Sequence, residues 1–278
     1  MTQMFYMLAI GHDRSLLMPY QLAILQLSGF NATGAKWSQQ DALGYAAAGE
    51  VPMLLQQDQV NQVLELPSPN SLLLAADGVS ASPAAAVASS SVVKYLLQHW
   101  PGTGFSSRQL RLAQQYLVDT LGRKRQSFGA ATTIAALHLS AERFVAINAG
   151  DSRIWRLRNG QLQQLSEDHD WQNDSAELKQ QTGLAQCYRA LTSYLAADSE
   201  AADFTVAVSD GALQTGDQFV LTTDGVHDLV TPEELAEMFA VADSATALQQ
   251  LQSLILERGA TDNASLLWLR PMANAGEC

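Results

Sequence analysis

Short apolar runs recur along the chain and predict strands. They cover residues 71–76, 132–139, 143–149, 204–208, 218–223 and 264–269. Runs of this length, rich in branched and aromatic residues and bounded by turn-forming residues, are typical of strands. The pair Asn159 and Gly160 separates "RIWRLR" from "QLQQLS" and suits the positive φ angles of a tight hairpin turn. Since hairpins join antiparallel neighbours, we expect antiparallel sheets.

Apolar residues at helical spacing, combined with capping residues, predict four helices. The first begins at Ser82 and Pro83, the second covers about 107–121, the third begins at Thr231 and Pro232, and the fourth covers about 244–257. Glu234 completes a capping box with Thr231 at the start of the third helix. Paired helices between groups of antiparallel strands indicate a layered α+β domain, since the alternation is too irregular for a doubly wound parallel sheet.

Two of the apolar runs end at an Asp-Gly pair, in "LLLAADGV" (72–79) and "FVLTTDGV" (219–226). A run that is apolar throughout is typical of a strand covered on both faces, and its last residue can project into a cleft at the sheet edge. The following glycine lets the backbone turn sharply and approach a ligand closely. A third pair, Asp210-Gly211, lies between two predicted strands, and a simple turn explains it.

Further acids occur in similar settings: Asp41 in "SQQDAL", Asp151 in "NAGDSR" and Asp262 in "TDNASL". If several of these acids converge, they need a counter-charge, because two like charges about 4 Å apart repel by roughly 4 kcal/mol at an effective dielectric of 20. A divalent cation would supply it. Oxygen ligands favour Mg²⁺ or Mn²⁺ over zinc.

The composition of the chain excludes several classes of protein. The chain has 278 residues, 47% of them apolar, which is ample for a core, and a net charge of −12 that would repel nucleic acid and anionic membranes. Its two cysteines, Cys187 and Cys278, argue against a disulfide scaffold and a thiolate zinc site. No run approaches the roughly 18 apolar residues of a membrane span. We expect a cytoplasmic protein that binds neither nucleic acid nor membrane.

The ordered series of motifs resembles the metal-dependent Ser/Thr protein phosphatases, the PPM or phosphatase-2C-type family, and above all its bacterial single-domain members. The motifs are "KWSQQDAL" (36–43), "AADGVS" (75–80), "GAATTIAAL" (129–137), "NAGDSRIW" (148–155), "GDQFVLTTDGVHDLV" (216–230) and "TDNASLL" (261–267). The resemblance implies an α+β fold in the form of a four-layer α-β-β-α sandwich, with two antiparallel sheets flanked by helix pairs.

The same resemblance divides the chain. Residues 1–27 would be an N-terminal extension that packs on the domain or leads into it. Residues 28–270 would form the phosphatase domain, with a short flap at about 170–189, and residues 271–278 a C-terminal tail.

The resemblance also implies a binuclear Mn²⁺ or Mg²⁺ centre. Asp77 would bridge the two ions, the carbonyl of Gly78 would bind one of them, and Asp224 and Asp262 would complete the ligands. Asp41 would act close to the ions, through a water. In this assignment Asp41, Asp77 and Asp224 are the catalytic residues, since they hold the water that the metals activate.

Two further assignments concern a third metal and the phosphate. Asp151 matches the acid that helps to hold a third, weaker ion in bacterial relatives. Lys36 stands where members commonly have an arginine that clamps the substrate phosphate. Lysine supplies a point charge without the bidentate fork of arginine, so we expect weaker or differently oriented phosphate binding.

The function implied is a protein serine/threonine phosphatase, in which a metal-activated hydroxide hydrolyses phosphoserine and phosphothreonine. Its partners would be phosphoprotein substrates and, as a functional counterpart, a separate bacterial Ser/Thr kinase, and the protein would be a monomer. The alternative is a phosphatase-like pseudoenzyme that binds phosphoproteins or a partner without cleaving them. Lys36 is the feature that supports this alternative.

Overall fold

The chain folds into two six-stranded antiparallel sheets that pack face to face. The computed structural model describes residues 19–68, 70–170, 191–200, 203–240 and 243–272. Strand order is β10-β9-β13-β14-β1-β4 in the first sheet and β12-β8-β7-β5-β2-β3 in the second. A separate two-stranded sheet pairs β11 with β6.

The strands are short and mostly buried. The first sheet consists of β1 (Tyr20–Leu27), β4 (Gln59–Leu66), β9 (Arg153–Arg158), β10 (Gln161–Gln164), β13 (Gln218–Thr222) and β14 (Ala264–Pro271). The second consists of β2 (Ala42–Ala47), β3 (Met53–Leu55), β5 (Ser71–Ala76), β7 (Ile134–Leu139), β8 (Arg143–Ala149) and β12 (Ala207–Ala212). The small pair is β6 (Ala131–Thr132) and β11 (Leu195–Ala196).

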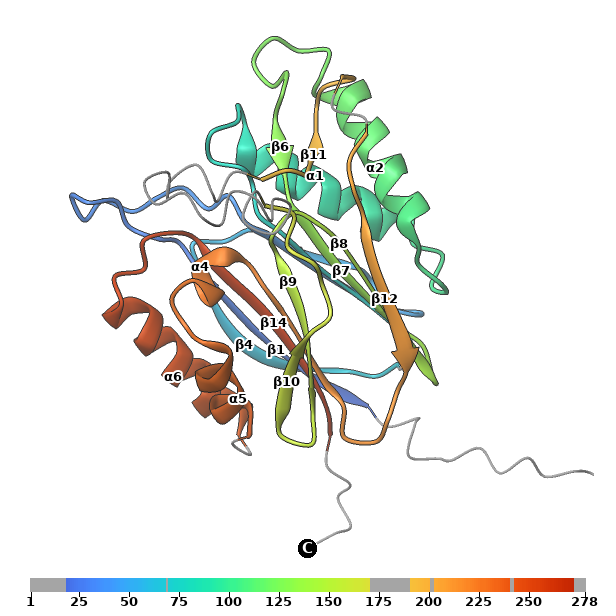
Figure 1. Cartoon of the computed structure of the whole chain (residues 1–278), viewed down its shortest axis with the longest axis vertical. Coiled ribbons are helices and arrows are strands. Elements are labelled where there is room, and N and C mark those ends of the chain that lie inside the picture. The colour runs from blue at the N-terminus through green and yellow to red at the C-terminus, as the bar shows by residue number, and fades with distance from the viewer. Residues whose placement is uncertain (1–18, 69, 171–190, 201–202, 241–242, 273–278) are drawn as a thin grey trace, which may run out of the picture.

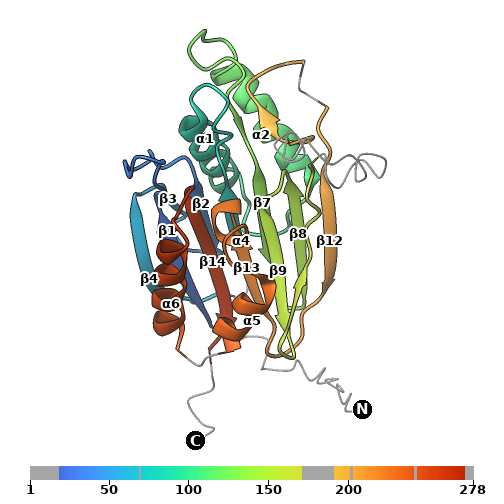
Figure 2. The same ribbon diagram turned by 60° about the vertical axis from the view of Figure 1, so that its left-hand side comes forward.

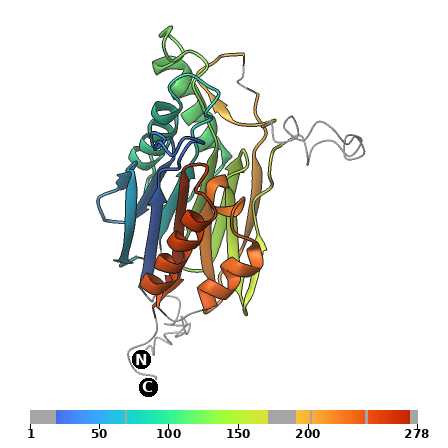
Figure 3. The same ribbon diagram turned by 90° about the vertical axis from the view of Figure 1, so that its left-hand side faces the viewer.

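Helices cover the outer face of each sheet (Figure 1). The helices are α1 (Ala85–Gln98), α2 (Ser107–Thr120), α4 (Asp224–His227), α5 (Pro232–Ala240) and α6 (Ser244–Glu257). Helices α1 and α2 pack on the second sheet, as the turned view in Figure 2 makes clear, and α5 and α6 lie across the first sheet in Figure 3. The predicted α+β sandwich of two antiparallel sheets flanked by helix pairs is confirmed.

The apolar run of β5 follows from its place between two cores. All six of its residues are buried. Leu72 and Leu74 belong to the core under α1 and α2, whereas Leu73 and Ala75 belong to the core between the sheets. Because successive side chains point to opposite faces, a strand covered on both faces must be apolar at every position.

Local signals in the sequence act as predicted at two places. Asn159 and Gly160 have φ angles of 52° and 76° and join β9 to β10 in a tight hairpin. At the start of α5 the Thr231 N–H donates to Glu234 Oε2 at 2.9 Å, and the Glu234 N–H donates to Thr231 Oγ1 at 3.3 Å. This is the predicted capping box.

The predicted turn at Asp210-Gly211 is wrong, because both residues lie inside β12. Asp210 pairs with Val145 of β8 in the antiparallel ladder, and its side chain forms an ion pair with Arg143. A Cβ at Gly211 would lie 2.9 Å from the ring of Phe144, so the glycine makes room for that ring. As an edge strand, β12 alternates between half-buried and exposed residues, and it therefore tolerates a sequence that looks like a turn.

The first predicted helix begins later than Ser82. Helix α1 starts at Ala85, after Ala84 with a φ of 53°. The hydroxyl of Ser82 instead accepts a hydrogen bond from the N–H of Ala131 at 2.9 Å. The turn before α1 is thus attached to β6 and is not the first turn of the helix.

Some of the expected segments lie at or beyond the limits of the described residues. Within the expected extension 1–27, residues Tyr20–Leu27 form β1, an interior strand between β14 and β4. The expected flap lies outside the described residues except for Asp170, and so does the tail after Met272. No helix in the described part of the chain is long and apolar enough to cross a membrane.

The core between the sheets generates a prediction about stability. Leu221 of β13 is fully buried in this core. We expect Leu221→Ala to lower the free energy of unfolding by about 2–5 kcal/mol, because the truncation leaves a cavity between the sheets. Urea unfolding of the purified protein measures the change.

Leu256→Ala is the matched control, because Leu256 lies on α6 with 45% of its surface exposed. Its effect should stay within about 0.5 kcal/mol. Equal losses in the two variants would contradict the assignment of Leu221 to a packed core.

Candidate metal centre

Five aspartates stand where strands begin or end. Asp41 immediately precedes β2, Asp77 immediately follows β5, Asp151 follows β8, Asp224 opens α4 just after β13, and Asp262 precedes β14. Three of these strands belong to the second sheet and two to the first. The acids therefore come from both halves of the sandwich.

Four of the five acids line one cavity of about 560 Å³: Asp77, Asp151, Asp224 and Asp262. Val79, Ser80, Ala131 and Tyr194 are among the other residues of its wall. Asp41 does not line the cavity and is fully buried. It accepts a hydrogen bond from Thr223, the residue before Asp224, and its charge raises the pKa values of Asp77 and Asp224.

Hydrogen bonds hold the backbone around Asp77 and the side chain of Asp41. The Asp77 N–H donates to Thr133 Oγ1 at 3.0 Å, and the Asp77 carbonyl accepts from the Thr133 N–H at 2.8 Å. Thr223, the residue before Asp224, donates its hydroxyl to Asp41 Oδ2 at 2.8 Å. The Thr223 bond thus links the segment of Asp224 to Asp41, and the Thr133 bonds attach the backbone of Asp77 to the start of β7.

Packing requires the glycine that follows Asp77. The Gly78 N–H donates to the Gln40 carbonyl at 3.2 Å. A Cβ at Gly78 would lie 2.6 Å from the Ala85 carbonyl oxygen and 2.9 Å from that of Gln40. Any larger residue would push Asp77 away from the start of α1, so the close approach of the backbone explains the glycine.

The electrostatics of the group are those of crowded, buried carboxylates. Burial, followed by repulsion from Asp224, Asp41 and other acids, raises the pKa of Asp77 well above its usual value. Burial, with repulsion from Asp151 first among the charges, does the same to the pKa of Asp224. Burial raises the pKa of Asp41 to about 7 and that of Asp151 to about 6. In the absence of a cation, ionisation of this group is costly.

The donor chemistry fits a divalent cation. Among the described residues, the buried oxygens Asp41 Oδ1, Asp151 Oδ1 and Asp224 Oδ1 have no hydrogen-bond partner. Buried oxygens without partners are rare in folded proteins, and an all-oxygen set suits Mg²⁺ or Mn²⁺. The described part of the chain does not, however, contain three acidic, histidine or cysteine side chains already arranged as the ligands of one ion. The carboxylates share a cavity without forming a closed coordination shell.

Sequence reasoning missed one acid of this group, Asp228. Its charge raises the pKa values of Asp151, Asp224 and Asp262. Its N–H donates to the Asp224 carbonyl at 2.8 Å. The signal was present in the sequence, because residues four positions apart lie on the same face of a helix.

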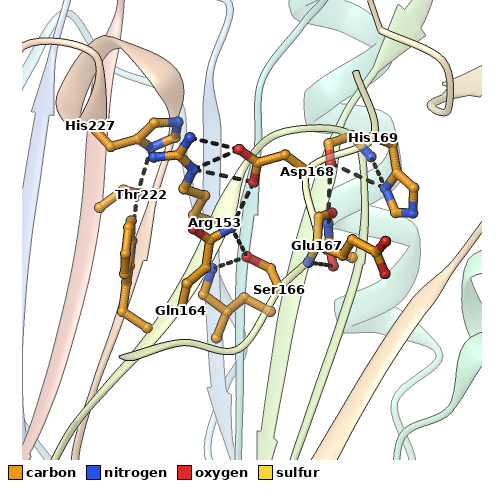
Figure 4. A network of polar contacts seen from close by, with 12 residues as sticks. Arg153, Gln164, Ser166, Glu167, Asp168, His169, Thr222 and His227 are labelled. Atoms are coloured by element: carbon orange, nitrogen blue, oxygen red, sulfur yellow. Dashed lines mark hydrogen bonds and ion pairs between the residues drawn. The ribbon is translucent and has the colours of Figure 1, made fainter. Parts of the chain in front are cut away.

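A polar network supports the turn that carries Asp151 (Figure 4). Arg153 binds Asp168 through two guanidinium nitrogens, at 2.9 and 2.6 Å to Oδ2. Gly150, with a φ of 105°, contacts His169, whose N–H donates to the Gly150 carbonyl at 3.1 Å. The Arg153 guanidinium therefore binds the Asp168 carboxylate, and this ion pair stabilises the turn.

Lys36 forms an ion pair with an acid outside this group. Its Nζ is 3.6 Å from Asp58 Oδ2, and the side chains of Lys36 and Asp58 are 43% and 65% exposed. Lys36 does not line the cavity that contains Asp77. Its assignment to phosphate binding therefore stays a prediction.

The raised pKa values generate a prediction for the metal-free protein. The pKa of Asp41 is about 7 in the folded chain and near 3.8 when it is unfolded, so the unfolded state releases this proton first as pH rises. We expect the free energy of unfolding, measured with urea in the presence of a chelator, to fall between about pH 4 and pH 7. Mn²⁺ added at pH 7 should restore stability. A profile that rises over this window would contradict the prediction.

A second prediction concerns Asp224→Asn. The substitution removes the Asp224 carboxylate. Burial and the charges of neighbouring acids make ionisation of this carboxylate unfavourable. We expect this variant to melt a few degrees higher than the wild type when both are metal-free at pH 7.5. Asp210→Asn is the control, because Asp210 is exposed and paired with Arg143, and it should not raise the melting temperature. An equal rise in both variants would refute a local cause.

Comparison with known proteins identifies the family of this chain. The protein phosphatase 2C family model matches residues 53–255. The serine/threonine protein phosphatase PstP of Mycobacterium tuberculosis is 24% identical over 205 residues, which cover 70% of this chain and 39% of the relative. The match thus spans about two fifths of that relative's length. The serine/threonine phosphatase stp of Listeria innocua is 24% identical over 214 residues, covering 70% of this chain and 82% of the relative.

Solved structures have the same fold. Stp1 from Staphylococcus aureus matches with a TM-score of 0.73 at 18% identity, covering 91% of this chain and 95% of that one. The catalytic domain of PstP, solved in complex with two manganese ions, matches with a TM-score of 0.66 at 20% identity, covering 92% and 100%. Because the family model matches most of the sequence, the chain belongs to the protein phosphatase 2C family.

Proposed function

We propose that this protein is a metal-dependent phosphatase that hydrolyses phosphoserine and phosphothreonine in proteins. The observation that carries the proposal is the meeting of four strand-end aspartates on one cavity, in a chain of this family. Their raised pKa values and unpartnered oxygens indicate a site that lacks positive charge. A phosphate monoester is itself anionic, so the site needs cations before it can accept one.

We assign the binuclear site to Asp77, the Gly78 carbonyl, Asp224 and Asp262, with Asp41 acting through a water. Asp151, which lines the same cavity, is assigned to a third, weaker ion. When bound, two Mn²⁺ or Mg²⁺ ions supply a water of lowered pKa as the nucleophile and neutralise the oxygens of the phosphate.

The chain's own groups orient that chemistry. The Thr223 hydroxyl holds Asp41 Oδ2, which leaves Oδ1 to accept a hydrogen bond from a water at the site. The bonds between Asp77 and Thr133 fix the backbone that carries the Asp77 carboxylate, which would hold the metal. Preorganised groups of this kind contribute to catalysis because they need no rearrangement during the reaction.

Lys36 remains our assignment for the phosphate contact. Its present partner, Asp58, is 3.6 Å away, and the side chains of Lys36 and Asp58 are 43% and 65% exposed. An exposed ion pair of this kind contributes little to stability. If Lys36 left Asp58 to bind a substrate phosphate, the stability of the fold would therefore change little.

The proposal extends to domain limits and partners. We assign the phosphatase domain to residues 28–270 together with β1 (Tyr20–Leu27), which the expected boundary left out although it is an interior strand of the first sheet. The residues before β1 would be an extension, and a flap would lie at about 170–189. The substrates would be phosphoproteins in the cytoplasm, and a separate Ser/Thr kinase would oppose the enzyme, which would act as a monomer.

Activity tests the proposal directly. We expect the purified protein to release p-nitrophenol from p-nitrophenyl phosphate when Mn²⁺ or Mg²⁺ is present and to stop when a chelator is added. Asp224→Asn should lower kcat/KM by more than about a hundredfold, because a metal ligand contributes more than the outer groups that support it. Asp210→Asn, which removes an exposed carboxylate outside the cavity, should keep the wild-type rate.

Calorimetric titration with Mn²⁺ separates this enzyme from the pseudoenzyme alternative. The proposal expects metal binding in the wild type and weakened binding in Asp224→Asn. A wild type that binds no Mn²⁺ and releases no phosphate would refute it and favour a binding module.

A further inference from the structure

A recess of about 350 Å³ adjoins the cavity that holds the acids. Its wall consists of Trp37, Gln40, Ser80, Thr261, Asp262 and Asn263. Ser80 and Asp262 line both spaces, so the recess opens beside the candidate metal centre. A peptide whose phosphorylated side chain reached the acids would therefore have neighbouring residues within reach of the recess.

Trp37 forms the apolar side of this recess and is 47% exposed. The loop before it is held by internal bonds. The Trp37 N–H donates to the Gly29 carbonyl at 2.8 Å, and Asn31 Oδ1 accepts from the Ala35 N–H at 2.9 Å. Gly34, with a φ of 78°, completes the turn. A large aromatic ring on a preformed loop loses little entropy on binding, and aromatic residues of this kind often anchor a partner.

The rest of the wall is polar, and hydrogen bonds fix part of it. Gln40 Oε1 accepts from the Ser80 hydroxyl at 2.7 Å, and Asn263 Oδ1 accepts from the Gln40 N–H at 2.8 Å. Asn263 is 2% exposed, and its Nδ2 has no hydrogen-bond partner among the described residues. Because that donor is covered, the exposed ring of Trp37 is the part of the wall that a substrate side chain would contact.

We propose that this recess is a specificity subsite for a basic side chain, arginine or lysine, close to the phosphorylated residue of a protein substrate. The inference rests on the phosphatase function proposed above and adds the kind of substrate. A cation packs favourably over the face of a tryptophan. Apart from Asp262, which we assign to the metal centre, the described residues that line the recess are uncharged, so none of them repels a cation. The net charge of −12 attracts basic peptides at longer range.

The shared wall limits where the basic residue stands in the substrate. An extended peptide advances by about 3.3–3.6 Å per residue. Because Ser80 and Asp262 belong to both spaces, the side chain that enters the recess should lie within about three positions of the phosphoserine, on one side of it.

Phosphopeptides test the proposal. The set places one arginine at each position from three before to three after the phosphoserine, in an alanine background. A glutamate series at the same positions is measured beside it. For the wild type with Mn²⁺, we expect arginine at one or two of these positions to lower KM by about threefold to tenfold relative to alanine, and glutamate at the same positions to raise it.

Variants at Trp37 then identify the subsite. Trp37→Ala should bring the ratio of the KM values for the arginine and alanine peptides close to one, while Trp37→Phe should keep part of the preference. Leu112→Ala is the matched control, because Leu112 is equally exposed at 45% but lies on α2 and lines neither space. It should keep the wild-type ratio, and thermal unfolding checks that each variant is folded.

Three results would overturn the proposal. The arginine and alanine peptides could have the same KM in the wild type, the preference could survive in Trp37→Ala, or an apolar side chain could be preferred to arginine at every position. In each case p-nitrophenyl phosphate would still be hydrolysed. A wild type that leaves p-nitrophenyl phosphate intact would instead refute the phosphatase function itself.

Discussion

Repulsion among buried carboxylates is the constraint on which the site depends. Asp41, Asp77, Asp151 and Asp224 all have pKa values raised by burial, and repulsion between neighbouring acids adds to each of them. Side chains left to relax in water would separate, so something must hold them together. Here it is the backbone, because each acid sits at a strand end or a helix start, and Thr133 and Thr223 bind the segments to one another.

The sandwich provides that rigidity. Its two sheets pack on each other through one core and on helix pairs through two more. Burial of this extent can offset a destabilising group at one end of the molecule, and binding sites commonly conflict with stability in this way. A cation at the site would remove the conflict, since it neutralises the acids whose ionisation opposes folding. Metal binding and the stability of the fold therefore depend on the same charges at the site.

The recess beside the acids has a different character. The cavity is lined by four aspartates, whereas the recess is lined by one aromatic ring, neutral polar groups and the shared Asp262. Charge at the cavity would attract any phosphate once cations are bound. Selection among phosphoproteins must come from contacts with the residues around the phosphate, and the loop that carries Trp37 offers such a contact.

The sequence by itself determined the parts of the protein that depend on neighbouring residues. These include the hairpin at Asn159 and Gly160, the capping box at Thr231, the buried run of β5 and the aspartates at strand ends. Only the tertiary structure decided which of those acids share a cavity, that Asp210 lies within an edge strand, and that Trp37 lines a recess beside the cavity. The reason is physical: caps, turns and periodicity act over a few residues, whereas convergence depends on the pairing of strands far apart in the chain.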